Sequence, residues 1–225
     1  MFFVILMLST IEKRWHMERV IQAILDSIEE QEKTVIRICG HGASGKTTLA
    51  KRLYQVLPKD STYLLETDAY IISNSSGVQV TYDLKGVEGC YQMPACHPAR
   101  HELASLKRDI LMFRKGMDLL TIDTSWSPSQ IISRQGKLLI VEGMSSTFLE
   151  KELFDLSIFC YTDNETELQR RLQRDTSERG RQAHFVMQSH QHRRRQYQLY
   201  LEPVQKNGEF LLNQSQNKCL LERKT

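Results

Sequence analysis

The segment GHGASGKT at residues 40–47 constrains this chain more than any other feature. It fits the P-loop pattern of Gly, four residues of any type, Gly, Lys, and then Ser or Thr. An apolar β-branched run, residues 34–39, precedes it, and residues 48–54 follow with good helix formers at helical spacing. Glycines let backbone N–H groups converge on phosphate oxygens, and a helix N-terminus adds partial positive charge. The segment therefore predicts a phosphate-binding unit of strand, loop and helix.

The position of each residue in the pattern suggests its role. We expect Lys46 to reach the terminal phosphates of a nucleoside triphosphate and Thr47 to bind Mg²⁺. The loop reads no base, so the nucleotide is ATP or another nucleoside triphosphate. The predicted phosphate-binding residues of this segment are Gly40, His41, Gly42, Ala43, Ser44, Gly45, Lys46, Thr47 and Thr48.

Composition favours one domain in a reducing compartment. A chain of 225 residues with 40% apolar content can bury one core and carry a small lid. Five cysteines without a C-x-x-C pair argue against a disulfide framework, so we expect a cytoplasmic protein. The net charge is only +3, although residues 170–195 hold eight arginines and two acids. The low overall charge disfavours nucleic acid as a partner and favours an anionic small molecule, although a solvated charged face would also explain the arginine run.

The N-terminus reads as an extension. The apolar residues 1–8 are too few to span a bilayer, and Lys13 and Arg14 follow the run, whereas a secretory signal carries its basic residues first. We therefore expect residues 1–16 to be a non-native or disordered extension, no membrane partner, and a single domain over residues 17–225. From Glu18 onward, apolar residues on one helical face predict an amphipathic helix on the core.

Two predicted strands end beside acidic residues. Residues 62–66 read as a strand that delivers Asp68 to its carboxyl end, and residues 137–143 read as a buried strand that contains Glu142. Open α/β sheets bind ligands at this edge. Glu142 is therefore a candidate for ordering Mg²⁺, and Asp68 lies where a catalytic carboxylate would act. An Asp that merely ends a strand or caps a helix is the alternative.

The remaining pattern alternates between strands and helices. Such alternation predicts an α/β fold with a doubly wound, mainly parallel sheet and helices on both faces. Trp126, in the loop that follows the expected strand at residues 119–123, would wall a pocket or cover the core. We expect a long functional or disordered loop at residues 73–98, helices at 102–114, 164–174 and 190–200, and strands at 119–123, 155–161 and 209–212.

Together these segments resemble the uridine kinase and phosphoribulokinase family of P-loop kinases over residues 34–203. The resemblance rests on the P-loop, on residues 66–70 and 140–143, and above all on RRLQRDTSERGR at residues 170–181, which looks like the family's lid. It implies a P-loop NTPase fold with a small helical lid at about residues 171–192. It also implies ATP-dependent transfer of the γ-phosphoryl group to a hydroxyl of a small metabolite, either a nucleoside or a sugar- or vitamin-like alcohol.

The same resemblance implies residue roles. Asp68 would be the general base, with Lys46 and Arg174 also catalytic, and Glu142 would support Mg²⁺ together with Thr47. Phosphoryl transfer needs a hydroxyl aligned with the γ-phosphorus, positive groups that counter the charge on the phosphoryl oxygens, and a site that excludes water. The roles implied by the resemblance meet these requirements. The lid residues that would close over the phosphates are Arg171, Arg174, Arg179 and Arg181.

The chain departs from the family's uridine kinases where the nucleoside should bind. Those enzymes carry Tyr-Asp-Phe and a following His after the middle strand, whereas residues 122–126 read IDTSW. They also carry a His-Pro-Asp-like segment, whereas residues 97–100 read HPAR. We therefore expect a rebuilt acceptor pocket. Its candidate residues are Tyr70, Tyr82, Asp83, Arg100, His101, Asp123 and Trp126.

The main alternative function is a nucleotide-dependent regulatory or switch ATPase without a small-molecule acceptor. An arginine-rich lid beside a separate acceptor pocket disfavours that alternative. A degenerate kinase that serves as a scaffold is disfavoured by the intact Lys46, Thr47, Asp68 and Glu142. The sequence is compatible with a homo-oligomer and does not identify the acceptor.

Overall fold

The computed structural model describes residues 16–29, 31–205, 208–216 and 218–223, so most of the predicted N-terminal extension lies outside the described residues. A six-stranded sheet forms its centre, in the order β10-β9-β8-β1-β7-β2. All pairs are parallel except that of β10 with β9. The strands are β1 (Thr34–Gly40), β2 (Thr62–Glu66), β7 (Leu138–Glu142), β8 (Leu156–Tyr161), β9 (Phe210–Asn213) and β10 (Leu220–Arg223).

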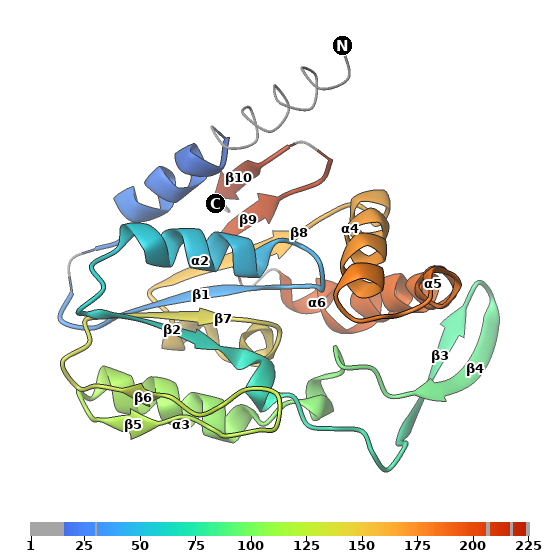
Figure 1. Ribbon diagram of the computed structural model, residues 1–225, viewed down its shortest axis with the longest axis horizontal. Helices are drawn as coiled ribbons and strands as arrows, with labels where there is room; N and C mark the ends of the chain where they lie inside the picture. The colour runs from blue at the N-terminus through green and yellow to red at the C-terminus, as the bar shows by residue number, and fades with distance from the viewer. Residues whose placement is uncertain (1–15, 30, 206–207, 217, 224–225) are drawn as a thin grey trace.

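Helices cover both faces of this sheet (Figure 1). Helix α2 (Lys46–Val56) and the helical residues 16–26 lie on one face, while α3 (Leu103–Arg114) lies on the other. Alternate residues of β1 pack on the two faces, because side chains of a strand alternate. Ile36 and Ile38 belong to the core with α2, whereas Val35 belongs to the core with α3. The predicted doubly wound sheet is therefore confirmed.

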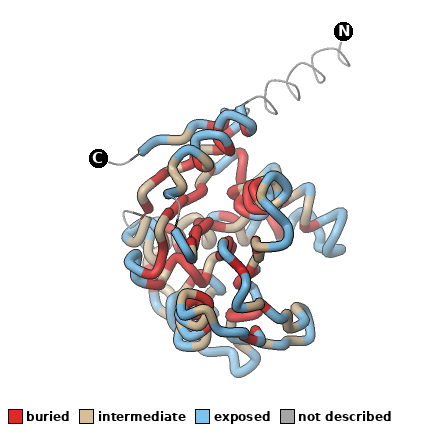
Figure 2. Tube along the Cα trace, turned by 90° about the vertical axis from the view of Figure 1, so that its left-hand side faces the viewer, coloured by how far each residue is buried: buried red, intermediate tan, exposed pale blue. Residues whose placement is uncertain are grey.

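The N-terminal helix is amphipathic as predicted. Val20, Ile21 and Ile24 are buried and belong to the same core as α2. Figure 2 shows that buried segments concentrate in the interior of the fold, whereas the outer loops are exposed. None of the helices within the described ranges has the length and apolarity to cross a membrane.

Two helices in contact with each other cover the region predicted to be the lid. Helix α4 (Asn164–Ser177) begins at an N-cap, Asp163, whose side chain accepts a hydrogen bond from the Thr166 backbone N–H. It extends beyond residue 174, where we expected it to end. Helix α5 (Ala183–Tyr200) begins well before residue 190, and the turn between the two helices contains Gly180 with φ of +61°. Pro203 lies in the short helix α6 (Glu202–Gln205), which follows the end of α5.

The segment predicted as a long loop contains a β-hairpin, so that prediction was wrong. Strands β3 (Gln79–Leu84) and β4 (Val87–Gln92) pair across a two-residue turn, Lys85 and Gly86, with φ of 57° and 83°. Positive φ at both central residues is typical of the type I′ turn that suits hairpins. The hairpin extends from the body of the molecule beside α5 (Figure 1).

Smaller elements complete the fold. The expected strand at 119–123 is only the short β5 (Leu119–Leu120), which pairs with β6 (Ile131–Ile132), and the polar tail contributes β10, which we did not predict. Four 3₁₀ turns are η1 (Thr67–Tyr70), η2 (Pro98–Arg100), η3 (Ser145–Phe148) and η4 (Lys151–Leu153).

Candidate active site

The P-loop connects β1 to α2 through left-handed backbone conformations. Ala43 and Gly45 have φ of 59° and 90°, and Gly40 has φ of 130°. A Cβ atom on Gly40 would lie 2.0 Å from the carbonyl oxygen of Cys160, and one on Gly45 would lie 2.5 Å from the Gln214 side chain. The backbone of Cys160 therefore requires glycine at position 40, and the positive φ favours glycine at position 45. Turns of this kind form concave nests of N–H groups that bind anions.

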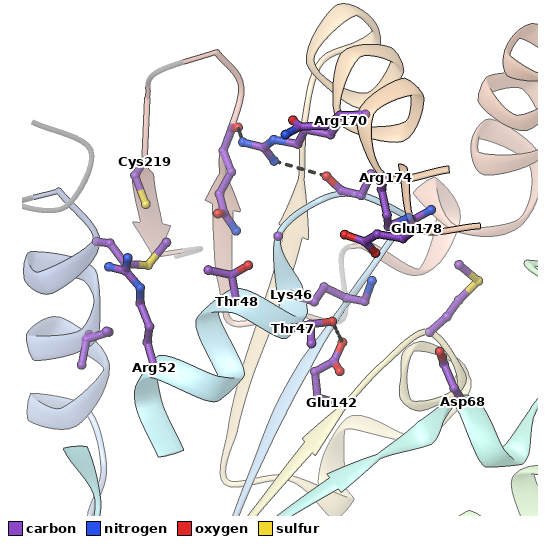
Figure 3. A pocket seen from close by; sticks show the side chains of 18 of the residues that line it. Lys46, Thr47, Thr48, Arg52, Asp68, Glu142, Arg170, Arg174, Glu178 and Cys219 are labelled. Carbon is purple, nitrogen blue, oxygen red and sulfur yellow. Dashed lines mark hydrogen bonds between the residues drawn. The ribbon is translucent and has the colours of Figure 1, made fainter. Parts of the chain in front are cut away.

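A cavity of about 1400 Å³ opens over this loop at the carboxyl edge of the sheet (Figure 3). Segments far apart in the sequence line it, among them the P-loop with α2, the turn after β2, the end of β7, α4 and α5. Its lining includes Gly42, Ala43, Gly45, Lys46, Thr47, Thr48, Asp68, Glu142, Arg170, Arg174 and Arg179.

Lys46, Thr47 and Glu142 lie together on the floor of this cavity (Figure 3). The Lys46 Nζ donates to the His41 carbonyl oxygen at 3.0 Å, and the Thr47 hydroxyl donates to Glu142 Oε1 at 3.3 Å. Burial raises the pKa of the Glu142 carboxyl, and the positive charge of Lys46 lowers it in part. A buried carboxylate beside a hydroxyl and a cation thus faces the P-loop.

This pair of oxygen ligands fits a magnesium ion that is also bound by phosphates. Mg²⁺ prefers oxygen ligands and is usually held by one or two protein side chains together with substrate phosphates and water. Within the described residues, no group of three or more His, Cys, Asp or Glu side chains could hold a metal ion. Thr47 and Glu142 would therefore share the ion with a nucleotide.

Asp68 lies beside Glu142 because β2 and β7 are in register. Glu66 and Glu142 are paired residues of the two strands, so the turn η1 that follows β2 reaches the same edge. Ser145 fixes that turn, because its hydroxyl donates to the Thr67 carbonyl oxygen at 3.1 Å. Asp68 consequently lines the P-loop cavity.

His41 is a structural residue of the P-loop. Its ring Nδ1 donates to the Gly42 carbonyl oxygen at 2.8 Å, and the Thr162 backbone N–H donates to Nε2 at 2.9 Å. The ring also stacks on Tyr197, with 5.0 Å between ring centroids. Burial lowers the pKa of His41 to about 3, so the ring is neutral at physiological pH. The His41 side chain therefore stabilises the conformation of the P-loop.

The four predicted lid arginines converge on one buried carboxylate, Asp175, which our sequence reasoning missed. The nearest nitrogen–oxygen distances to Asp175 are 2.9 Å from Arg174, 3.6 Å from Arg179, 3.7 Å from Arg171 and 3.8 Å from Arg181. Burial alone would raise the pKa of Asp175, but the Arg174 hydrogen bond and the surrounding positive charges lower it overall. Asp175 is four residues from both Arg171 and Arg179, and this i,i+4 spacing is the sequence signal that would have predicted the ion pairs.

The arginines differ in what they face. Arg174 and Arg179 line the P-loop cavity, whereas Arg171 is 1% exposed and lines neither described cavity. Arg170, which we did not single out, also lines the P-loop cavity and donates to the Ala43 carbonyl oxygen at 3.2 Å. Arg181 lines a second cavity of about 560 Å³ between α5 and the segments that flank the hairpin.

Among the predicted acceptor-binding residues, only Arg100 lines either cavity. Tyr70 is buried and donates to Asp109, and His101 is buried with its Nδ1 at 2.8 Å from the Ser145 hydroxyl. Tyr82 and Asp83 join the hairpin to α5: the Tyr82 hydroxyl accepts from Gln196 at 2.9 Å, and the Asp83 carbonyl oxygen accepts from Arg195 at 2.9 Å.

The last two of those residues lie in the loop between β5 and β6. Asp123 is exposed and accepts from the Ser129 backbone N–H. Trp126 is 57% exposed, and its indole N–H donates to the Asp68 carbonyl oxygen at 3.3 Å. Trp126 therefore contacts the turn that carries Asp68, and it neither lines a cavity nor covers the core.

A mainly parallel sheet whose central strand enters a glycine loop and helix, with acids on neighbouring strands, defines a P-loop nucleotide-binding protein. The sequence model of the "Phosphoribulokinase / Uridine kinase family" matches residues 35–219. The chain therefore belongs to the phosphoribulokinase and uridine kinase family and is a P-loop kinase.

Curated relatives agree with this family assignment, and solved structures share the fold. The chain is 26% identical to a uridine kinase of Lactobacillus johnsonii over 193 residues, which cover 82% of this chain and 88% of the relative. It is 28% identical to a uridine kinase of Brevibacillus brevis over 186 residues, which cover 79% and 83%. The fold resembles that of phosphoribulokinase from Rhodobacter spheroides, with a TM-score of 0.57, 13% identity, and coverage of 83% of this chain and 71% of that one. It also resembles D-glycerate 3-kinase from Cryptococcus neoformans, with a TM-score of 0.56, 11% identity, and coverage of 93% and 97%.

Proposed function

We propose that this protein transfers the γ-phosphoryl group of ATP to a hydroxyl of a small metabolite. The observation that carries the proposal is that Lys46, Asp68, Glu142 and Arg174 line one cavity although they come from four different segments. Membership of a family of P-loop kinases supports the same reaction class. A nucleotide switch needs no carboxylate such as Asp68 beside the phosphates.

In this mechanism Asp68 accepts the proton of the acceptor hydroxyl late in the reaction. A bond forms between the hydroxyl oxygen and the γ-phosphorus. The bond between that phosphorus and the β,γ-bridging oxygen breaks, and its electron pair leaves with ADP. Lys46 and Arg174 counter the charge on the phosphoryl oxygens, which matters most in a site with little water.

Thr47 and Glu142 would hold Mg²⁺, which neutralises phosphate charge when bound. The lid contributes Arg174 and Arg179 to this cavity, and Arg171 and Arg181 position them through their shared partner Asp175. Closure of the lid excludes water and so protects ATP from hydrolysis.

Substitution of Asp68 tests the proposal. We expect Asp68→Asn to lower kcat for phosphoryl transfer by about 100-fold or more, because general-base catalysis contributes roughly 10²–10⁴-fold. The Kd of a non-hydrolysable ATP analogue should stay within about twofold, since Asp68 does not belong to the phosphate cradle. The assay would follow transfer from labelled ATP to a panel of small alcohols, with acceptor-free hydrolysis measured in parallel.

Asp60→Asn is the matched control, because Asp60 is an exposed carboxylate near the opposite end of the same strand, β2. It should leave turnover unchanged. Full turnover in Asp68→Asn would refute the proposed base. Hydrolysis of ATP without transfer to any alcohol would favour a switch ATPase instead.

A further inference from the structure

A second cavity adjoins the P-loop cavity. Its volume is about 560 Å³, within the usual range for small-molecule sites. Met144, Arg193 and Tyr197 line both cavities, so the two spaces meet at these side chains. A molecule in the second cavity can therefore extend a hydroxyl toward the phosphate end of the first.

Positive charge dominates the second cavity. Arg100, Arg181 and Arg193 line it from three different segments, and none of the described residues that line it is an Asp or a Glu. A cleft lined by charge of one sign concentrates ligands of the opposite sign. This composition differs from that of the P-loop cavity, whose lining includes Asp68 and Glu142.

Direct ion pairs with protein groups neutralise little of this charge, although Arg193 interacts electrostatically with the buried Glu167. Arg100 donates to the carbonyl oxygens of Ile72 at 2.6 Å and Met93 at 3.1 Å, which carry no formal charge. Arg193 forms no hydrogen bond or ion pair with any residue that the structure describes. Arg181 approaches an acid, Asp175, but only at 3.8 Å. A guanidinium that is partly removed from water in this way favours an anionic partner.

The uncharged part of the lining suits a compact polar molecule better than a nucleobase. Bases are commonly recognised by stacking on aromatic faces. Two aromatic rings are in the described lining of this cavity: Tyr197 is 4% exposed and already stacked on His41, and His192 contacts Tyr82 and Tyr91 of the hairpin. The lining instead offers hydrogen-bonding groups from Ser73, Ser75 and Gln92.

We propose that the acceptor is a small alcohol that carries an oxyanion, a carboxylate or a phosphate, held in the second cavity by Arg193 together with Arg100 and Arg181. This inference rests on the proposed kinase function and names the substrate class of the same site. Arg193 sets the specificity, because it lines both cavities. The hydroxyl end of the acceptor extends toward Asp68, and the anionic end remains among the arginines.

Paired probes test this proposal by binding as well as turnover. With saturating non-hydrolysable ATP analogue and Mg²⁺, calorimetry would compare glycerate with glycerol, ribose 5-phosphate with ribose, and uridine as a neutral nucleoside. At least one anionic probe should bind at least about tenfold more tightly than its neutral counterpart, because hydrogen bonds to charged groups are roughly twice as strong as neutral ones. The pair that shows the difference distinguishes a carboxylate from a phosphate.

Arg193→Met keeps the length of the side chain and removes its charge. It should weaken binding of the anionic probe about 10- to 100-fold, and Arg193→Lys should restore part of it. Arg134→Met is the matched control, since Arg134 is an exposed arginine that lines neither cavity. With ATP, the kcat/KM values of the probes should follow the same order.

The outcomes separate this inference from the proposed function. Equal or tighter binding of the neutral probes, or anion binding unchanged in Arg193→Met, overturns the anionic-acceptor proposal. Rapid phosphorylation of uridine in preference to both anionic probes overturns it too, while leaving the kinase function intact. Arg193-dependent binding of an anionic probe supports it even if no probe is phosphorylated, and that absence of turnover would count against the proposed function alone.

Discussion

The carboxylate of Asp175 organises more positive charge than any other single group among the described residues. It is 1% exposed and lies within 4.0 Å of four guanidinium groups, one of which, Arg171, is equally buried. Removing one partner of a buried ion pair is strongly destabilising, because an uncompensated charge stays behind.

We therefore expect Asp175→Ala to lower the free energy of unfolding by about 3 kcal/mol. Urea denaturation measures the loss, and Glu178→Ala, the removal of an exposed carboxylate from the C-cap of the same helix, is the control. A change below about 0.5 kcal/mol in Asp175→Ala, the size typical of surface sites, would show that the arginine cluster is held by other contacts.

A buried histidine makes stability depend on pH. Burial lowers the pKa of His101 to about 4, whereas an unfolded histidine titrates near 6.5. The unfolded chain therefore binds a proton at a pH where the native His101 does not, and stability falls as the pH drops from about 6.5 to 4. His41, with its pKa of about 3, acts in the same direction.

We expect the free energy of unfolding to decrease between pH 7 and pH 5, by at most about 1.4 kcal/mol per pH unit for each buried histidine. Urea denaturation at pH 7, 6 and 5 measures this slope. His101→Asn should flatten it, while His184→Asn should leave it unchanged because His184 is exposed. The same slope in His101→Asn and in the natural chain would show that His101 does not cause the pH dependence of stability.

The positions of individual site residues could be predicted where backbone geometry dictates the residue. Glycine loops have few alternatives, so the P-loop and the approach of Glu142 to Thr47 followed from spacing alone. The direction of a side chain in an irregular segment is set by tertiary packing, and no local pattern encodes it. For that reason Tyr70 and His101, two acceptor candidates, proved to be buried bracing residues.

The β3–β4 hairpin is the element that shapes the second cavity. Tyr82 stacks on Tyr91 at 4.4 Å between ring centroids, and its hydroxyl accepts from Gln196 of α5. The residues on either side of the hairpin supply much of the cavity lining. Docking of the hairpin on α5 should therefore control acceptor binding.

Tyr82→Ala tests this coupling. We expect faster hydrogen exchange at residues 79–92 and an acceptor KM raised about tenfold, because the substitution removes both the ring contact and the hydrogen bond. The Kd of the ATP analogue should change by less than about twofold, since the P-loop lies elsewhere. The control is Val87→Ala in β4, where the side chain is 67% exposed. Slower release of the nucleotide with no change in the acceptor KM would contradict the coupling between hairpin docking and acceptor binding.

The strands of the central sheet other than β10 were predictable because they are apolar runs with clear ends. The hairpin was missed because its residues are half-exposed, so the alternation from residue 79 to 84 was read as lacking a period. The turn at Lys85 and Gly86 was the signal that should have prompted a hairpin prediction. Strand β10 lies in the polar tail, where only pairing with β9 reveals it.

The molecule as a whole places a phosphate cradle and a basic cavity side by side. The cradle belongs to the sheet and α2, whereas the basic cavity depends on the hairpin flanks and α5, which are distant from one another in the sequence. The class of the fold could be inferred from the order of strands and helices. The junction of the two cavities could not be inferred from the sequence, because it depends on how the hairpin docks against α5.

The most direct test of the central claim is a crystal structure of the full chain with a non-hydrolysable ATP analogue and Mg²⁺. The account predicts the phosphates on the P-loop, Lys46 Nζ within about 3 Å of a γ-phosphate oxygen, and the Asp68 carboxylate facing the γ-phosphorus with room for a hydroxyl between them. A nucleotide bound outside the P-loop, or an Asp68 carboxylate turned away from the γ-phosphorus, would contradict it.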